Sequence, residues 1–156
     1  MKGLAMFLTG LITGILLSVI IIVLVLPKQM FVVNESKYGF EETVAKIEQS
    51  VKDNDWSMPH LYDLQATMKK HGFDVKPVKV FSLCKPDHAY KILSSDEERV
   101  VSALMPCRVA VYERNGKTYV SMLNSGLFSK LMGNKVKTVM GAASEENKQI
   151  LAPVIK

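Results

Sequence analysis

The sequence predicts an α+β protein: one transmembrane helix, then one small mixed or antiparallel sheet with helices packed on it. Three observations predict this. The first 26 residues are almost all apolar, and after them short β-branched runs alternate with amphipathic stretches. An Asn115-Gly116 dipeptide lies between two alternating runs, which is typical of a tight type I′ hairpin. Because such a hairpin joins neighbouring antiparallel strands, the order of elements favours α+β over a doubly wound sheet.

Charge and cysteine content exclude several classes of protein. The 156 residues contain 20 Lys and Arg against 15 Asp and Glu, a net charge of +5. A nucleic-acid binder needs clustered basic residues rather than this mild surplus, so we expect no nucleic-acid partner. The 2 cysteines are too few for a disulfide-dense scaffold or for a zinc site of four thiolates.

The apolar segment at 4–26 contains no charged residue. As a helix it would be roughly 34 Å long, enough to cross a hydrocarbon core of about 30 Å. A cleaved signal peptide is the alternative, but its apolar region is usually shorter and ends in small residues. This run ends in large residues before Pro27. We therefore expect an uncleaved anchor at 1–27 and a soluble domain at 28–156.

The orientation of the anchor is set by the residues that flank it. Lys2 precedes the span, and Lys28 and Lys37 follow it, so the basic residues are nearly balanced. A short basic tail before a long span is the usual plan of a signal anchor with its N-terminus inside. The sequence therefore favours a single-pass membrane protein whose soluble domain is extracytoplasmic.

Small residues recur every four positions within the span. Gly10, Gly14 and Ser18 would lie on one helix face, where small side chains let two helix backbones approach closely. The alternative is that Gly is simply common in membrane helices. A single span has no partner in its own chain, so pairing here would produce an oligomer.

The first half of the soluble part reads as strand, helix, strand and short helix. Residues 30–33 (Met-Phe-Val-Val) predict the first strand, and apolar residues at helical spacing predict a helix over 40–51. Residues 56–62 read as a strand with Pro59 at an edge or bulge. A short helix over 64–70 then ends near Gly72.

The second half reads as strand, helix, hairpin and closing helices. Residues 77–84 predict a strand, and Pro86 suits the first turn of a helix that runs to about residue 93. Residues 100–113 read as extended, broken at Pro106. A two-residue hairpin loop then pairs Arg114 with Lys117. Two helical stretches within 126–152 close the chain: one at about 127–132, with a continuation to Met140 as an alternative, and one at 144–151.

The hairpin register also predicts the core face. Four apolar residues of the two strands then share one face with Cys107: Val109, Val111, Val120 and Met122. The other face carries more polar residues, so we expect the first set to be buried.

Cys84 and Cys107 are the most distinctive reactive residues. Each lies eight residues into an extended stretch, and a helix separates the stretches. If the two strands are parallel neighbours joined by a right-handed crossover, the sulfurs lie at the same height of the sheet. A disulfide there would contribute roughly 3 kcal/mol in an oxidising compartment. The alternative is two buried free cysteines packed as small apolar groups.

Other chemistry is only weakly indicated. His88 lies four residues after Cys84, and Met105 precedes Pro106-Cys107, a set that suits copper(I) or the axial positions of haem. No haem-attachment motif is present, so no cofactor or metal is predicted. No known catalytic motif occurs, and adjacent carboxylates such as Glu145 and Glu146 are usually solvated. The sequence therefore does not decide whether the protein is an enzyme, and the absence of a known motif favours a protein without catalytic activity.

Two motifs resemble a known family. Cys-Lys-Pro-Asp-His-Ala at 84–89 and Met-Pro-Cys-Arg-Val-Ala-Val-Tyr at 105–112 resemble the paired motifs of domain-of-unknown-function family 302. Lys85 replaces the family's Asn and Met105 its Leu, and the resemblance covers about residues 30–124. It implies an α+β domain with a TATA-binding-protein-like arrangement, usually dimeric, and no settled activity.

The favoured hypothesis is a membrane-anchored, homodimeric binding or interaction module for a small-molecule or protein ligand that the sequence does not identify. A thiol-based redox or sulfur-handling enzyme is the alternative, and a haem or copper carrier is the second alternative. The candidate thiol or ligand site consists of Cys84, Pro86, His88, Ala89, Pro106 and Cys107.

Overall fold

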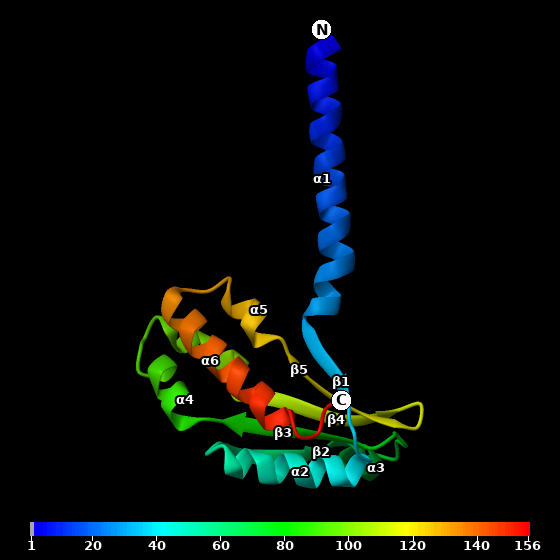
Figure 1. The fold of residues 1–156 in the computed structure, drawn as a ribbon, viewed down its shortest axis with the longest axis vertical. Coiled ribbons are helices and arrows are strands. Elements are labelled where there is room, and N and C mark those ends of the chain that lie inside the picture. Colours follow the sequence, from blue (N-terminus) through cyan, green and yellow to red (C-terminus); the bar gives the residue numbers. More distant parts are fainter. Residues whose placement is uncertain (1) are drawn as a thin grey trace. The chain divides into compact units, whose positions relative to one another are not determined.

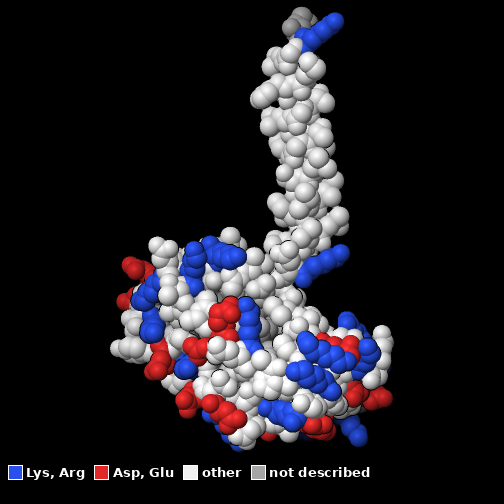
Figure 2. Space-filling view, in the orientation of Figure 1, with Lys and Arg blue, Asp and Glu red and all other residues white. Residues whose placement is uncertain are grey.

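A computed structural model of the chain describes residues 2–156 and divides it into two compact units, one ending at Phe31 and the other covering Val32–Lys156. The first unit contains helix α1 (Lys2–Gln29). An 18-residue window of this helix has a mean hydropathy of 2.8, and the helix is long and apolar enough to cross a membrane. In Figure 2 it carries charged side chains only near its two ends. A signal sequence has the same properties, so α1 establishes one apolar N-terminal helix and no more.

The second unit is built on one five-stranded antiparallel sheet in the order β1-β5-β4-β3-β2. The strands are β1 (Phe31–Glu35), β2 (Ser57–Asp63), β3 (Val78–Cys84), β4 (Cys107–Arg114) and β5 (Lys117–Leu123). The helices are α2 (Phe40–Asp53), α3 (Leu64–Lys70), α4 (Pro86–Leu93), the 3-10 helix η1 (Glu98–Leu104), α5 (Ser125–Ser129) and α6 (Asn134–Leu151). The α+β prediction is confirmed.

Helices α2 and α6 pack against one face of this sheet (Figure 1). The helical stripe predicted for α2 is buried throughout: Phe40, Val44, Ile47 and Val51. It meets the inward face of the sheet and the buried side of α6, which ends in Ile150 and Leu151. A satellite cluster beyond the end of the sheet joins Ile92 of α4 and Val101 of η1 to Val136 and Val139 of α6.

The hairpin forms as its turn residues dictate. Asn115 and Gly116 have φ values of 52° and 72°, and the register pairs Arg114 with Lys117. Both turn residues therefore occupy the left-handed region that a type I′ turn requires. The predicted core face is buried: Val109, Val111, Val120 and Met122. On the opposite face the rings of Tyr112 and Tyr119 stack, with their centroids 5.8 Å apart.

Three sequence predictions were wrong in detail. Strands β3 and β4 are antiparallel, with Leu83 opposite Cys107, so no crossover helix joins parallel strands. The predicted extended stretch at 100–113 begins as η1, because Val101 packs into the satellite cluster instead of joining the sheet. The last helix runs over Asn134–Leu151 and includes Gly141, because its buried side is continuous from Val136 to Leu151.

Candidate functional site

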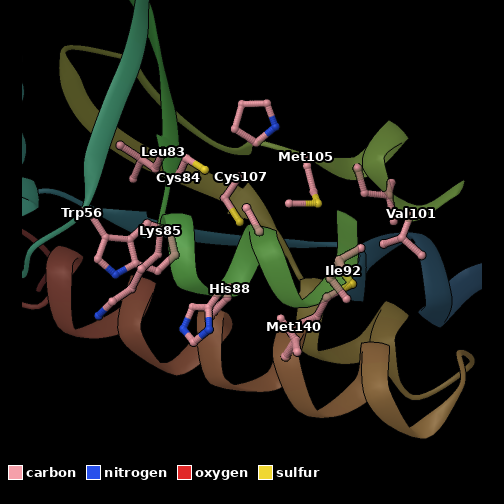
Figure 3. Close-up of a pocket in the computed structure, with 15 residues that line it drawn as sticks. Trp56, Leu83, Cys84, Lys85, His88, Ile92, Val101, Met105, Cys107 and Met140 are labelled. Atoms are coloured by element: carbon pink, nitrogen blue, oxygen red, sulfur yellow. The ribbon is translucent and has the colours of Figure 1, made fainter. Parts of the chain in front are cut away.

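A partly open cavity of about 50 Å³ lies where β3 ends and β4 begins, bordered by α4, η1 and α6. Its lining is mostly apolar, and Figure 3 shows the side chains that surround it. Four of them carry sulfur: Cys84, Met105, Cys107 and Met140. Three others carry nitrogen: Trp56, Lys85 and His88.

The antiparallel pairing of β3 and β4 brings the two cysteines to the cavity. Cys84 is the last residue of β3 and Cys107 is the first of β4, so both lie at the same end of the sheet. Leu83 is the register partner of Cys107. The two motifs are therefore brought to one end of the sheet by an antiparallel strand pair, and not by the parallel crossover that the sequence suggested.

Local signals place α4 beside this strand end. Lys85 is the N-cap residue, and Pro86 occupies the first helical turn, where its missing N–H is not needed. Ala89 and Ile92 are the buried residues of α4, and both line the cavity. The helix therefore forms one wall of the cavity.

Five of the six residues of the predicted site line this cavity: Cys84, His88, Ala89, Pro106 and Cys107. Pro86 is not among the lining residues; it begins α4, the helix that carries His88 and Ala89. The geometry thus gathers these residues around one space. That they bind a ligand remains a prediction.

Both thiols are free and partly buried. Burial raises the pKa of the Cys84 thiol. Burial is also the largest cause that raises the pKa of Cys107; the nearby amide of Asn147 opposes this increase, and Cys84 adds to it. Neither thiol is therefore activated as a thiolate at neutral pH, in contrast to catalytic cysteines.

A charged cluster borders the cavity between α4 and α6. The Glu146 carboxylate accepts hydrogen bonds from Lys85 Nζ at 2.7 Å, from His88 Nε2 at 2.7 Å and from Trp56 Nε1 at 2.9 Å. Burial alone would raise the pKa of Glu146, but these three donors outweigh it and lower the pKa to about 2. Glu146 is therefore ionised at neutral pH and holds α4 against α6.

The protonation of the His88 ring follows from its partner. An ionised carboxylate only accepts hydrogen bonds, so His88 Nε2 must donate to Glu146. The other ring nitrogen, Nδ1, is buried and has no hydrogen-bond partner among the described residues. Buried polar atoms are normally satisfied, so this nitrogen is free to meet a water molecule or a ligand.

Sequence reasoning missed Glu146. Because Glu145 directly precedes it, the two carboxylates resembled a solvated pair. The signal was present in the helical spacing, because Ala143 and Ile150 are buried on α6 and lie three and four residues from Glu146. It was overlooked because the helix was expected to begin near residue 144.

The small-residue stripe lies within α1 as expected. Nothing lies within 4 Å of the position where a Cβ would stand at Gly10 or Gly14, and Ser18 Oγ donates to the Gly14 carbonyl oxygen at 2.9 Å. Helix pairing through this stripe remains a prediction. Among residues 2–156, no group of three or more His, Cys, Asp or Glu side chains could hold a metal ion.

Comparison with known proteins identifies similar sequences and folds. The family model "Domain of unknown function DUF302" matches residues 32–154. A crystal structure of an uncharacterized conserved DUF302 protein from Bacillus stearothermophilus superimposes with a TM-score of 0.71 at 21% sequence identity, covering 79% of this chain and 96% of that chain. At that identity the likeness shows the fold alone. No curated protein matches the chain.

Proposed function

The chain belongs to the DUF302 family. We propose that it is a membrane-anchored binding module whose ligand site is the sulfur-lined cavity. One observation carries the proposal: a single cavity collects both cysteines, two methionines and a histidine whose Nδ1 has no partner among the described residues. A module of this kind holds its ligand by enclosure and a few soft or polar contacts, without chemical turnover.

The size of the cavity limits the class of ligand. Organic ligands usually occupy pockets of about 300–1,000 Å³, whereas this cavity measures about 50 Å³. A volume of this order suits one ion or a molecule of a few atoms. It favours such a ligand over haem, whose macrocycle would require the walls to separate.

Xenon tests whether the cavity accepts a small guest, because this apolar atom enters dry protein cavities. We expect the methyl NMR signals of Met105 and Met140 to shift saturably when the detergent-solubilised full-length protein is pressurised with xenon. Ala143→Val should reduce the shift, because Ala143 lines the cavity. Ala142→Val is the matched control on the exposed side of α6. Equal, unsaturable shifts in all three proteins would contradict the proposal.

A thiol-based redox or sulfur-handling enzyme is the alternative function, and the shared location of Cys84 and Cys107 supports it. The raised pKa values of both thiols favour binding over nucleophilic chemistry. Thiol counting by mass spectrometry on membrane-isolated protein, with and without reductant, separates the two. A bridge that forms and breaks at physiological potentials supports the enzyme. Two permanently free, unreactive thiols support the binding module.

The proposed module is a homodimer. The stripe of small residues on α1 supports this proposal: Gly10, Gly14 and Ser18. Gly14→Ile should shift the protein toward monomer in detergent micelles, because a large side chain keeps the two backbones apart. Leu16→Ile, on a different helix face, is the matched control. Sedimentation analysis measures both variants. A wild-type protein that is monomeric throughout would remove the dimer from the proposal.

The proposed location is an extracytoplasmic domain on an uncleaved anchor. The length and hydropathy of α1 support the anchor, and the short basic tail before it supports export. Mass spectrometry of the mature protein should find the N-terminal segment still present, and protease added outside intact cells should degrade the soluble domain. A mature chain that lacks α1 would identify a signal sequence instead.

A further inference from the structure

We propose that the connection between α5 and α6 is a second membrane contact, in which Leu131 enters the lipid interface and Lys130 and Lys137 bind anionic headgroups. The partner is the surface of the bilayer in which α1 is anchored. This inference rests on the proposed function, because it requires α1 to be an anchor. It goes beyond that function by giving the soluble domain an interaction surface of its own.

The first support is the exposure of one apolar side chain on an ordered turn. Among the described large apolar residues Leu131 is the most exposed, at 87%. Its N–H donates to the Phe128 carbonyl oxygen at 3.1 Å, and the Met132 N–H donates to the Ser129 carbonyl oxygen at 3.1 Å. Met132 also packs against the satellite cluster. Single exposed apolar residues are common on protein surfaces, so the charge around Leu131 decides what it meets.

The second support is that charge. Between Glu113 and Glu145 the sequence contains no Asp or Glu but five basic residues: Arg114, Lys117, Lys130, Lys135 and Lys137. Lys135 pairs with Glu98 at 3.3 Å, whereas no carboxylate of the described residues 2–156 forms an ion pair with Lys130 or Lys137. Figure 2 shows blue side chains over the upper edge of the second unit. An exposed apolar residue beside unpaired lysines suits an anionic lipid surface.

The third support is the place at which the chain enters the second unit. The start of β1 and the α5–α6 connection both lie at the upper edge of that unit (Figure 1). A flat surface along this edge would therefore meet both. By chain length alone, the five residues between Leu26 and Val32 span at most roughly 20 Å. The start of β1 is thus kept near the end of the apolar run, which for an anchor is the lipid interface.

The short tether makes a weak contact sufficient. Each Lys near an anionic surface contributes only about fivefold to the binding equilibrium, so these residues would not hold an unanchored domain on a bilayer. A short linker turns the same contact into an intramolecular step with an effective concentration on the order of millimolar. Replacing both lysines should therefore lower the ratio of docked to undocked domains about 30-fold.

The test measures contact between a tryptophan at position 131 and brominated lipid chains, which quench tryptophan emission at short range. Full-length Leu131→Trp is reconstituted through α1 into vesicles of equal parts phosphatidylcholine and phosphatidylglycerol. Wild-type emission, which comes from Trp56 alone, is subtracted. We expect strong quenching in Leu131→Trp and little in Phe73→Trp. Phe73 is the matched control, because it is 63% exposed and lies between α3 and β3.

The charge is tested in the same protein. Lys130→Gln together with Lys137→Gln should reduce the quenching of Leu131→Trp to the extent given above, and vesicles of phosphatidylcholine alone should do the same. Added salt should also reduce it, because salt screens exposed charges. Quenching that ignores both lysines, lipid charge and salt would overturn the contact with anionic headgroups. Near-ultraviolet circular dichroism of each variant confirms that the fold persists.

The remaining outcomes separate this contact from the proposed function. Equal quenching in Leu131→Trp and Phe73→Trp, in protein that floats with the vesicles, would overturn the contact and leave the anchor standing. A chain that does not float with the vesicles would overturn the anchor and the contact together. Concentration-dependent burial of the new tryptophan in lipid-free detergent would assign this surface to a second copy of the chain instead. None of the three substituted positions, 130, 131 and 137, lines the cavity, so xenon binding should stay as in the wild type.

Discussion

Glu146 on α6 accepts a hydrogen bond from His88 Nε2 on α4 at 2.7 Å, and the same carboxylate accepts from Lys85 Nζ at 2.7 Å. One ionised side chain thus connects the two helices that bound the cavity. The exposed fraction of the Glu146 side chain is 29%, so this contact is only partly screened by solvent. The shape of the cavity therefore depends on a residue that does not line it.

Glu146→Gln should lower the free energy of unfolding by about 1–3 kcal/mol, because Lys85, His88 and Trp56 lose a charged acceptor at a half-buried position. Urea denaturation followed by near-ultraviolet circular dichroism measures this change. Glu145→Gln is the matched control. The Glu145 side chain is 68% exposed and pairs only with Lys148 among the contacts of the described chain, so its loss should cost less than about 1 kcal/mol. Equal effects of the two variants would contradict the connecting role of Glu146.

The same cluster predicts a loss of stability in acid. The pKa of Glu146 falls from its ordinary 4.5 to about 2 in the folded protein, so the unfolded chain binds this proton more tightly. The stabilisation is complete above about pH 4.5 and is lost as the pH falls toward about 2. Emission from Trp56, the single tryptophan, should change over this range, because its indole N–H donates to the same carboxylate.

Glu146→Gln provides the control for the acid transition, because the glutamine side chain does not titrate. Its unfolding free energy should depend less steeply on pH below 4.5 than that of the wild type. If both proteins lose stability in parallel, other carboxyl groups govern acid unfolding.

Alkylation should be slow at both cysteines at neutral pH and should accelerate as the pH rises above 9. The thiolate is the reacting form, and burial raises the pKa of each thiol above the usual 9.0. Quenched iodoacetamide labelling followed by peptide mass spectrometry gives the two rates separately. A denatured sample supplies the reference rate for each peptide. A cysteine that reacts faster in the folded protein than in the denatured one would contradict this prediction.

The elements that the sequence predicted most closely are those with strong local signals. Asn115-Gly116 determined both the turn and the register of β4 and β5, because few residues tolerate positive φ. Pro86 marked the start of α4 for an equally local reason. The relation between β3 and β4 is not local, since Cys84 and Cys107 are separated by α4 and η1. Either strand direction satisfies the same hydrophobic pattern.

The candidate site shows the same difference between features with local signals and features that depend on tertiary packing. The two cysteine motifs are visible as sequence, and the structure places both on one cavity. Their proximity was expected from a parallel crossover and arises from an antiparallel ladder. The spacing of buried residues on α6 indicates the helix face of Glu146 but not its partners, because its hydrogen bonds depend on α6 packing against α4. Side chains that act across elements require the tertiary structure.

The hairpin offers a final prediction about stability. Gly116 has φ of 72°, a conformation that costs other L-residues about 1–2 kcal/mol. Nothing lies within 4 Å of the position of an added Cβ at Gly116, so the penalty of Gly116→Ala is conformational and not steric. We expect the free energy of unfolding to fall by about 1–2 kcal/mol.

Gly141→Ala is the matched control for this substitution. Gly141 lies inside α6, and an added Cβ there also meets nothing within 4 Å. Alanine favours the helix by about 0.5–1 kcal/mol over glycine, so Gly141→Ala should raise stability while Gly116→Ala lowers it. Thermal unfolding of the two variants beside the wild type measures the difference. Shifts in the same direction would show that Gly116 does not hold the left-handed conformation that the turn requires.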